Sequence, residues 1–502
     1  MAPLKILFAI VFCIGWLAFL KFPLLSRKKK KPPGPRRFPI IGNALQMPRN
    51  YEWGTLSKWA KEYGDLVYLE TFGRPVVLLN SRKVAKDLLE HRSAIYSDRP
   101  HLFSSGFDKA FVLQQHNDDW RLQRKIVSQD LSPRMVPRYH NFLESAARHL
   151  ARDVIQDPSR LTHLVKLKIG TILIRIFYGH YVSTDDDPFL TLVKASMNIF
   201  SKAAASGVWL VDSIPLLKHL PTWLPGTSSL LTAKSWRRIV SKAVWAPYAQ
   251  SKHSFEVGSV LLPNTCSTAL ETIGENLSAD QEEKVVWAVG TMTAGWLETS
   301  IIGTLNFFLA MMLNPKVQIK AQKEIDSVIG RDRLPTVADK SSLPYVRSVV
   351  AEVLRLNPPI PLGIFHALST DDVYEGMHIP KGSAVIANIW HMLHDAEVFS
   401  DPMRFDPDRY RNLDSEMDKV ANVVFGFGRR QCPGRLLAES VIFAIAVTVL
   451  ATCDIFPTVD KNGSDIIPNV VYSSGIFRFP SRFACDIRPR SDEAYDLLSL
   501  SC

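Results

Sequence analysis

The residues with the clearest chemical potential are one cysteine and the glycines and arginines around it. Residues 425–434 read Phe-Gly-Phe-Gly-Arg-Arg-Gln-Cys-Pro-Gly, and an apolar stretch with helical character follows at 436–452. Glycines let the backbone turn tightly and approach a flat ligand. A helix that begins just after Cys432 brings unpaired N–H groups and the positive end of its dipole near the thiol, which stabilises a thiolate. The pattern predicts a sulfur ligand for a haem iron, with a nearby arginine available for a propionate.

A carboxylate and a hydroxyl are neighbours in the segment 295–300, which reads Gly-Trp-Leu-Glu-Thr-Ser. Chemistry on bound dioxygen needs protons delivered in order, and Glu298, Thr299 and water can form such a relay. A threonine inside a helix can instead donate to the carbonyl four residues earlier. The pair therefore predicts a relay only where it lies beside a reactive centre.

Two residue pairs have the spacing of one helix face. Glu352 and Arg355 are three residues apart, and Trp120 and Arg124 are four apart, so each pair projects from the same side of a helix. A further arginine, Arg409, ends the segment Phe-Asp-Pro-Asp-Arg. Taken singly, each pair is an ordinary helix contact or ion pair.

One unusually long helix must carry the acid–alcohol pair. Ser278 and Gln281 form a capping-box pattern, and Asn314 followed by Pro315 is a stop signal. The intervening stretch of about 35 residues would be about 50 Å long. A helix of this length that is apolar in its second half must run through the middle of a large domain.

Helical periodicity dominates the rest of the chain, and the predicted strands are short. No second Pro/Gly/Ser-rich linker follows residue 37. We therefore expect one large, mainly α domain with a smaller β-rich part, although length alone suggests about three domains. Helices are predicted near 141–178, 315–330, 342–356 and 436–452, and strands at 66–70, 75–79, 373–379 and 384–389.

Together and in this order, the motifs resemble those of the cytochrome P450 family, the haem-thiolate monooxygenases. The resemblance runs from the Pro/Gly segment at 32–37 to Arg490, and the sequence looks most like fungal microsomal members. It implies the cytochrome P450 fold, as a single large haem domain. The matching motifs are the haem-binding loop at 425–434, E-x-x-R at 352–355, F-x-P-x-R at 405–409, W-x-x-x-R at 120–124 and the acid–alcohol pair at 298–299.

The resemblance implies a role for each motif residue. Cys432 would bind the iron of haem b, and Thr299 with Glu298 would be the catalytic residues that pass protons. The implied propionate partners are Arg430, Trp120, Arg124 and His366, although His366 could instead be a solvated loop histidine. The other cofactor-binding residues of the loop are Phe425, Gly426 and Gly434. A buried network of Glu352, Arg355 and Arg409 would brace the loop.

Trp296 departs from the family pattern, which has a glycine at this position. That glycine lets the helix open a groove for dioxygen and substrate, so a tryptophan should either narrow the pocket or turn away from it. Alternatively, Ala294 and Gly295 are the family pair, and one extra residue is absorbed as a π-bulge. The sequence leaves these alternatives open.

The formal net charge of +11 raises the question of nucleic acid, but the charge is concentrated at one end. Residues 1–37 hold nine basic residues and no acid, so the rest of the chain carries only +2. Residues 6–25 contain one charge and are long enough to cross a bilayer, and the basic residues 27–31 that follow should stay cytosolic. A cleaved signal peptide would carry its charge before the apolar run. We predict a transmembrane anchor with its basic flank over 1–31, a Pro/Gly hinge over 32–37 and a cytosolic catalytic domain over 38–502, at the endoplasmic reticulum and without a nucleic-acid partner.

The resemblance implies a membrane-bound monooxygenase that inserts one atom of O2 into a hydrophobic small molecule, by hydroxylation or epoxidation. No nicotinamide or flavin motif is present, so electrons would come from NADPH through a separate, flavin-containing NADPH–cytochrome reductase. We expect a role in fungal secondary metabolism, such as terpenoid or polyketide biosynthesis. The alternatives are a xenobiotic-detoxifying monooxygenase, and a haem-thiolate isomerase, dehydratase or peroxide-driven enzyme. The expected substrate-facing stretches are mostly apolar and comprise 102–112, 199–224, 359–365 and 472–477.

Overall fold

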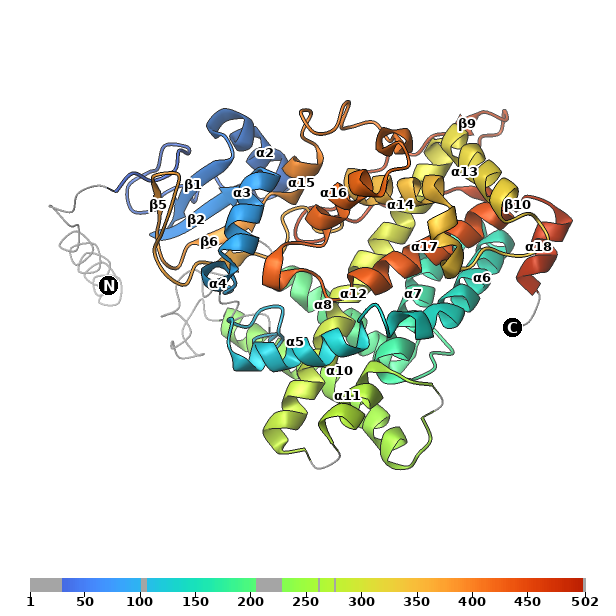
Figure 1. Cartoon of the computed structure of the whole chain (residues 1–502), viewed down its shortest axis with the longest axis horizontal. Coiled ribbons are helices and arrows are strands. Elements are labelled where there is room, and N and C mark those ends of the chain that lie inside the picture. Colours follow the sequence, from blue (N-terminus) through green and yellow to red (C-terminus); the bar gives the residue numbers. More distant parts are fainter. Residues whose placement is uncertain (1–28, 101–105, 205–227, 261, 275–276, 500–502) are drawn as a thin grey trace, which may run out of the picture.

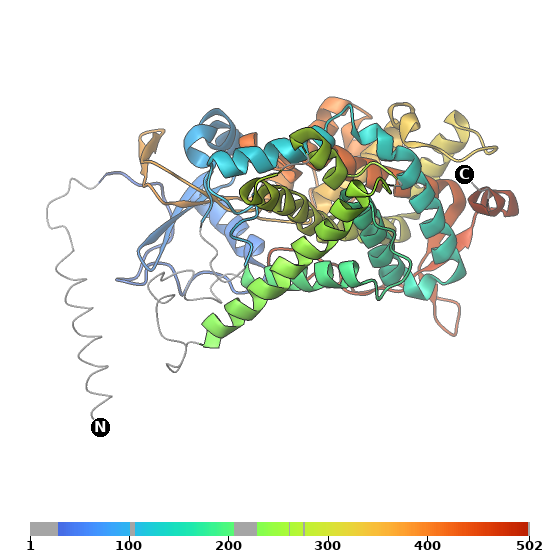
Figure 2. The same cartoon turned by 90° about the horizontal axis from the view of Figure 1, so that it is seen from below.

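The computed structural model describes residues 29–100, 106–204, 228–260, 262–274 and 277–499. The predicted anchor lies almost entirely outside these residues, as do parts of two of the predicted substrate-facing stretches. Helices fill most of the described structure, and a small sheet lies at one end of it (Figure 1). The turned view shows the same division (Figure 2). The predicted mainly α domain with a smaller β-rich part is confirmed.

The helices agree with the predicted stretches except at two places. The predicted stretch 141–178 is two helices, because Pro158 interrupts it, and the helix predicted from 342 begins at Pro344, after a 3₁₀ turn. In chain order, with η marking 3₁₀ or π turns, the helices are α2 (Glu52–Tyr63), α3 (Arg82–Lys86), η1 (Asp87–His91), α4 (Ser93–Tyr96), α5 (Asp118–Asp130), η3 (Val136–Tyr139), α6 (His140–Gln156), η4 (Pro158–Arg160), α7 (Leu161–Tyr178), α8 (Pro188–Ala203), α10 (Ser228–Glu256), α11 (Thr265–Ile273), α12 (Ala279–Leu313), α13 (Pro315–Val328), η6 (Val337–Ser342), α14 (Pro344–Leu356), α15 (Ile389–Leu393), η7 (Pro407–Tyr410), α16 (Asp414–Val424), η8 (Gly428–Arg430), α17 (Arg435–Thr452) and α18 (Asp492–Ser499).

The long helix α12 spans 35 residues and begins and ends where the sequence predicts. The Ser278 hydroxyl accepts from the Gln281 backbone N–H at 3.3 Å, and the Gln281 side chain accepts from the Ser278 backbone N–H at 3.0 Å. This is the predicted capping box, and α13 starts at Pro315. Because α12 is α-helical throughout, the alternative of a π-bulge beside Gly295 is wrong.

Helices α12 and α17 form the centre of the core. Among the described helices, these two are long and apolar enough to cross a membrane, but most of each is buried inside the domain. Helix α17 packs on α6, and α12 packs on α5 and α7. Helices that are apolar on all sides are typical of the interior of a large domain.

A four-stranded sheet in the order β1-β2-β6-β3 forms the β-rich end. Strands β1 (Leu66–Thr71) and β2 (Arg74–Leu79) are an antiparallel hairpin, and β6 (Ala384–Ala387) pairs in parallel with β2. Strand β3 (His366–Ala367) pairs antiparallel with β6, which carries His366 toward the centre of the domain. Three further antiparallel pairs are β4 (Asp372–Tyr374) with β5 (Met377–Ile379), β7 (Cys453–Phe456) with β10 (Asp486–Pro489), and β8 (Thr458–Val459) with β9 (Asp465–Ile466).

The Pro/Gly segment at 32–37 lies along β1. The Tyr68 backbone N–H donates to the Pro33 carbonyl at 2.8 Å. A Cβ added to Gly34 would lie 2.1 Å from the Tyr68 carbonyl oxygen. Only glycine allows the segment to approach the strand this closely.

Ion pairs to β1 add to these backbone contacts. Lys31 and Arg37 pair with the Glu70 carboxylate at 3.5 and 3.1 Å. Both cations also lie over the Tyr68 ring, 4.5 and 5.3 Å from its centroid. The segment that joins the predicted anchor to the domain is therefore fixed to the sheet.

Gly34→Ala should destabilise the fold, because the new Cβ clashes with a backbone carbonyl of β1. We expect the free energy of unfolding to fall by about 1–3 kcal/mol, measured by chemical denaturation of the haem-loaded protein. Gly54→Ala in α2 is the matched control, since a Cβ there meets nothing within 4 Å, and it should be neutral or stabilise by up to about 1 kcal/mol. Equal losses in both variants would contradict the close approach.

Candidate active site

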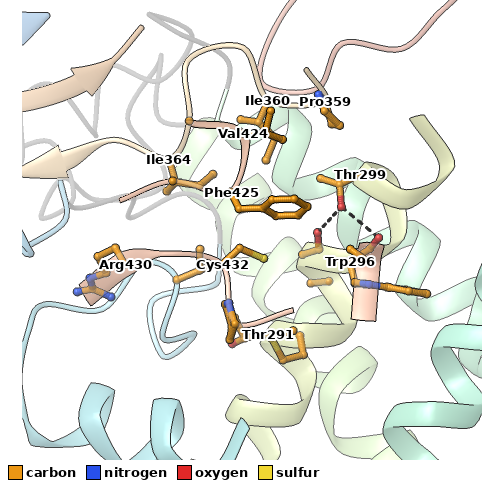
Figure 3. A pocket seen from close by; sticks show the side chains of 18 of the residues that line it. Thr291, Trp296, Thr299, Pro359, Ile360, Ile364, Val424, Phe425, Arg430 and Cys432 are labelled. Carbon is orange, nitrogen blue, oxygen red and sulfur yellow. Dashed lines mark hydrogen bonds between the residues drawn. The ribbon is translucent and has the colours of Figure 1, made fainter. Parts of the chain in front are cut away.

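One cavity brings together residues from the predicted motifs. It has about 1660 Å³ of empty space, its open mouth included. The middle of α12, the segment after α14, the start of β3 and the loop before α17 form its wall. Figure 3 shows Cys432 and Phe425 from this loop and Thr299 from α12 around the same space. The residues of the predicted haem loop and Thr299 of the predicted relay therefore border one cavity.

The loop before α17 folds back so that its cysteine borders the cavity. The Cys432 backbone N–H donates to the Phe425 carbonyl at 2.8 Å. Gly426 and Gly428 have φ values of +76° and +55°, which favour glycine. A Cβ on Gly428 would also lie 2.1 Å from the Leu89 carbonyl oxygen. The glycines are needed for the turn and for the close contact with η1.

The Cys432 thiol is open to the cavity but lies deep in the domain. Burial raises its pKa, while the Gly434 backbone N–H and the charges of Arg124 and Arg435 act in the opposite direction. The start of α17 therefore favours the thiolate, as the sequence predicts, but burial is the larger effect on the thiol itself. A metal ion that binds the sulfur replaces its proton.

Three buried arginines, Arg99, Arg124 and Arg430, surround one end of the cavity. They donate to backbone carbonyl oxygens at 2.5–3.0 Å, and none pairs with a carboxylate in the part of the chain that the structure describes. Burial lowers the pKa of each, that of Arg430 to about 9. Buried charges are costly unless they are paired. Two propionates would supply the missing negative charge.

Trp120 adds an unused donor at the same end of the cavity. The Arg430 guanidinium lies 4.6 Å from the centroid of its ring. The indole Nε1 is buried and has no hydrogen-bond partner among the residues that the structure describes, although buried polar groups are rarely left without one. An anionic group at this end would accept from Nε1. Trp120, Arg124 and Arg430 therefore fit a haem.

His366 on β3 also lies on the cavity wall and is buried, so it is not a solvated loop histidine. Its Nδ1 is 2.8 Å from the Tyr96 carbonyl oxygen, which can only accept, so Nδ1 carries a hydrogen. Burial and the charges of Arg99 and Arg430 lower the pKa of His366. These effects favour the neutral ring, whereas the negative charge of a propionate beside it would favour the protonated ring, in which Nε2 donates.

The two predicted relay residues lie in different surroundings. Thr299 borders the cavity, and its hydroxyl donates to the carbonyls of Gly295 at 3.1 Å or Trp296 at 3.2 Å (Figure 3). Glu298 is not among the residues that line the cavity. Burial raises its pKa, and Lys166 of α7 acts in the opposite direction. Any proton that passes between them must cross the helix edge through water.

Of the two orientations considered for Trp296, the structure shows the one in which the side chain turns away instead of narrowing the pocket. Figure 3 shows its indole extending from α12 away from Phe425. The ring meets Phe177 of α7 edge-on, with 6.3 Å between centroids and an angle of 87°. Its Cδ1 lies 3.7 Å from the position of a Cβ on Gly434. The indole thus forms part of the wall instead of crossing the cavity.

Glu352 and Arg355 form a fully buried ion pair near the end of α14. Arg355 donates from Nε and Nη2 to the two carboxylate oxygens at 2.7 and 2.8 Å, and neither side chain is exposed. Arg409 Nε and the Tyr410 hydroxyl donate to the same carboxylate at 3.0 and 2.6 Å. Leu354, next to Arg355 in α14, lines the cavity, so the network fixes the helix that carries this part of the wall.

Sequence analysis did not identify Arg99 or Tyr410. Arg99 belongs to no motif, and its bonds to carbonyls more than 250 residues away become visible only in the folded chain. Tyr410 directly follows Arg409, which was a usable signal. Its bond to Glu352 depends on the η7 turn, which the sequence did not indicate.

Comparison with known proteins gives matches over nearly the whole chain. The cytochrome P450 family model matches residues 32–474. Cytochrome P450 monooxygenase 105 of Postia placenta is 47% identical over 483 residues, 95% of this chain and 93% of that protein. Cytochrome P450 monooxygenase 226 of the same fungus is 45% identical over 477 residues, 94% and 91%. Cytochrome P450 monooxygenase claT of Ampulloclitocybe clavipes is 36% identical over 476 residues, 93% and 92%.

The helical fold, the cysteine loop and the buried arginines around one large cavity define a haem-thiolate oxidoreductase. With a family match over most of its length and relatives aligned almost end to end, the chain belongs to the cytochrome P450 family and is a monooxygenase. Its cofactor is haem with a thiolate ligand, and NADPH supplies electrons through a partner reductase, as is general in the family. The predicted family, enzyme class and cofactor are confirmed.

Glu352→Gln should destabilise the protein strongly, because it removes the charge that balances the buried Arg355. We expect a loss of about 3–5 kcal/mol in the free energy of unfolding, measured by denaturant titration. Glu416→Gln is the control, since Glu416 is only partly buried and pairs with Lys419; it should change stability by less than about 0.5 kcal/mol. A small effect of Glu352→Gln would show that the network does not support the fold.

Trp120→Phe should weaken haem retention, because it removes the unpartnered Nε1 donor and keeps an aromatic ring beneath Arg430. A hydrogen bond to a charged group contributes about 1.5–3 kcal/mol, so haem transfer to apomyoglobin should become tenfold faster or more. Trp287→Phe is the matched control: its Nε1 is also buried and unpartnered, but it does not line the cavity. Equal transfer rates for the two variants would exclude Trp120 as a propionate donor.

Proposed function

We propose that this protein is a membrane-anchored monooxygenase that hydroxylates or epoxidises a hydrophobic small molecule in fungal secondary metabolism, such as terpenoid or polyketide biosynthesis. The observation that carries the proposal is the apolar cavity with Cys432 and Thr299 around the same space. The family relationship supports the reaction class, and the chemistry of the lining supports the substrate class.

Cys432 would bind the haem iron through its sulfur, and the positive end of the cavity would hold the propionates. The unpaired arginines and the free Trp120 Nε1 support this orientation. Haem bound in this way supplies the activation of dioxygen and the transfer of one oxygen atom. The loop residues Phe425, Gly426 and Gly434 shape the cysteine's surroundings, and Arg430, Arg124, Trp120 and His366 are the propionate residues, to which the folded chain adds Arg99.

Thr299 delivers protons into the cavity and Glu298 resupplies them. The Thr299 hydroxyl donates to a helix carbonyl, so its oxygen can accept a proton from water on the cavity side. Burial raises the pKa of Glu298, which favours the protonated form that a donor needs. Its position near Lys166 supports a path to α7 and the solvent beyond.

The substrate is a neutral, largely apolar molecule. Apart from Cys432, His366 and the three arginines at the propionate end, the described lining residues carry no ionisable side chain. Aromatic and aliphatic side chains form most of the rest of the wall, beside the hydroxyls of Thr291, Thr299 and Ser300, and favour the burial of apolar surface. They include Phe107, Phe111, Phe200, Ile360, Ile364 and Phe477.

The partner is an NADPH–cytochrome reductase, which approaches the outer side of the cysteine loop. Arg429 in this loop is exposed and available to an acidic surface. Arg435 is engaged with Glu439 at 2.8 Å and Asp418 at 3.2 Å. Arg429 is therefore the stronger candidate for a charged contact with the reductase.

The chain is organised as an anchor over 1–31, a stiff hinge over 32–37 and a catalytic domain over 38–502, at the endoplasmic reticulum with the domain in the cytosol. The charge pattern of the leader supports this orientation. The contacts between the hinge and β1 support a fixed connection to the domain.

Spectroscopy and turnover test the proposal together. The reduced carbon monoxide complex should show the long-wavelength band of a thiolate ligand, and Cys432→His should lose it while haem remains bound. With NADPH, reductase and O2, microsomes should convert a hydrophobic substrate to a product with one added oxygen atom. A band that survives Cys432→His would refute the axial assignment. Turnover with peroxide but not with reductase would instead indicate the peroxide-driven alternative.

A further inference from the structure

Arg478 connects two cavity walls that are far apart in the sequence. It directly follows Phe477, which lines the cavity, and its backbone N–H donates to the carbonyl of Pro359, which also lines it, at 3.0 Å. The Arg478 side chain donates from Nη1 to the Asn357 side chain at the end of α14. The backbone and the side chain of one residue thus fix both walls to each other.

Aromatic rings enclose the Arg478 guanidinium. Its central carbon lies 3.6 Å from the ring centroid of Tyr472, 4.5 Å from that of Trp390 and 5.8 Å from that of Trp53. Burial lowers its pKa to about 10, so the group stays charged at neutral pH. Within the described part of the chain, ring faces and the Asn357 amide hold this charge without an ion pair to a carboxylate.

Tyr472 extends the connection to the central helix. Its hydroxyl donates to Asn306 Oδ1 at 3.1 Å, and Asn306 lies about two turns beyond Thr299 on α12. The segment that carries Tyr472 and Phe477 forms a loop, in which the Ser473 backbone N–H donates to the Phe479 carbonyl at 2.8 Å. Movement of this segment is therefore restrained from three sides.

We propose that Arg478 is a positioning residue that determines substrate specificity by fixing Phe477 relative to Pro359. Phe477 also contacts Phe200 of α8, with 6.2 Å between ring centroids, so its position decides the shape of the aromatic wall. The inference rests on the proposed function, because it assigns this wall to the hydrophobic substrate. Arg478 touches neither substrate nor cofactor and acts through Phe477.

Arginine suits this position and lysine does not. A planar guanidinium can stack on Tyr472 and Trp390 and still donate in its plane to Asn357, whereas an ammonium is a compact point charge that does not stack. Arg478→Lys keeps the charge and removes the stacking. This variant therefore loosens the wall without leaving an empty charged pocket.

The test compares two nitrogen ligands of the haem-loaded protein, the small imidazole and the bulky bifonazole, by the absorbance change on binding. In Arg478→Lys, we expect the dissociation constant of bifonazole to rise at least tenfold and that of imidazole to stay within twofold. Arg482→Lys is the matched control, because Arg482 is exposed four residues later, and it should change neither constant. An unchanged ratio of the two constants would overturn the proposal, whether both constants stay the same or both rise equally with a lowered unfolding midpoint.

A second variant covers the case in which Arg478→Lys does not bind haem. Asn357→Ala removes only the acceptor for Nη1 and should weaken bifonazole about threefold while leaving imidazole unchanged; an unchanged ratio would overturn the proposal here too. Azole binding needs haem but no oxygen chemistry. Intact azole selectivity without oxygenase turnover would therefore contradict the proposed function and leave the role of Arg478 standing.

Discussion

Positive charge buried without a counter-charge is the constraint on which the architecture of this site depends. The N–H groups of Arg99, Arg124 and Arg430 are satisfied by backbone carbonyls, but carbonyl dipoles do not neutralise three guanidinium groups in a poorly solvated cavity. These carbonyls come from the segments after α4, before α5, before β3 and before α17. An anionic cofactor that binds the folded chain but not the unfolded chain stabilises the folded state by mass action. The free energy of folding therefore depends on haem binding.

The Glu352 network is the opposite case, in which the protein completes its own electrostatics. One buried carboxylate receives donors from Arg355, Arg409 and Tyr410, and no polar capacity is left for a ligand. Hydrogen-bond satisfaction therefore distinguishes the residues that support the wall from the residues that bind a ligand. A satisfied buried cluster behind the wall stabilises it, whereas unsatisfied donors at the wall, such as Trp120 Nε1, mark where a ligand belongs.

What could be predicted from the sequence is what depends on near neighbours in the chain. The limits of α12 follow from a capping box and a proline, and the Glu352–Arg355 contact follows from helical spacing. The burial of His366 depends on the pairing of β3 with β6, and the orientation of Trp296 depends on Phe177 from another helix. Arg99 and Arg478 were missed because each acts on segments that lie far away in the sequence. The role of an isolated arginine has no local signature.

The basic residues after the proposed anchor can act at two stages. During synthesis the domain is still unfolded, so all of them are free positive charges that can set the orientation of the anchor. After folding, Lys29 pairs with Asp371, and Lys31 and Arg37 pair with Glu70. In the proposed arrangement, more free positive charge is therefore available during membrane insertion than after folding, when Lys29, Lys31 and Arg37 are held in ion pairs with the domain.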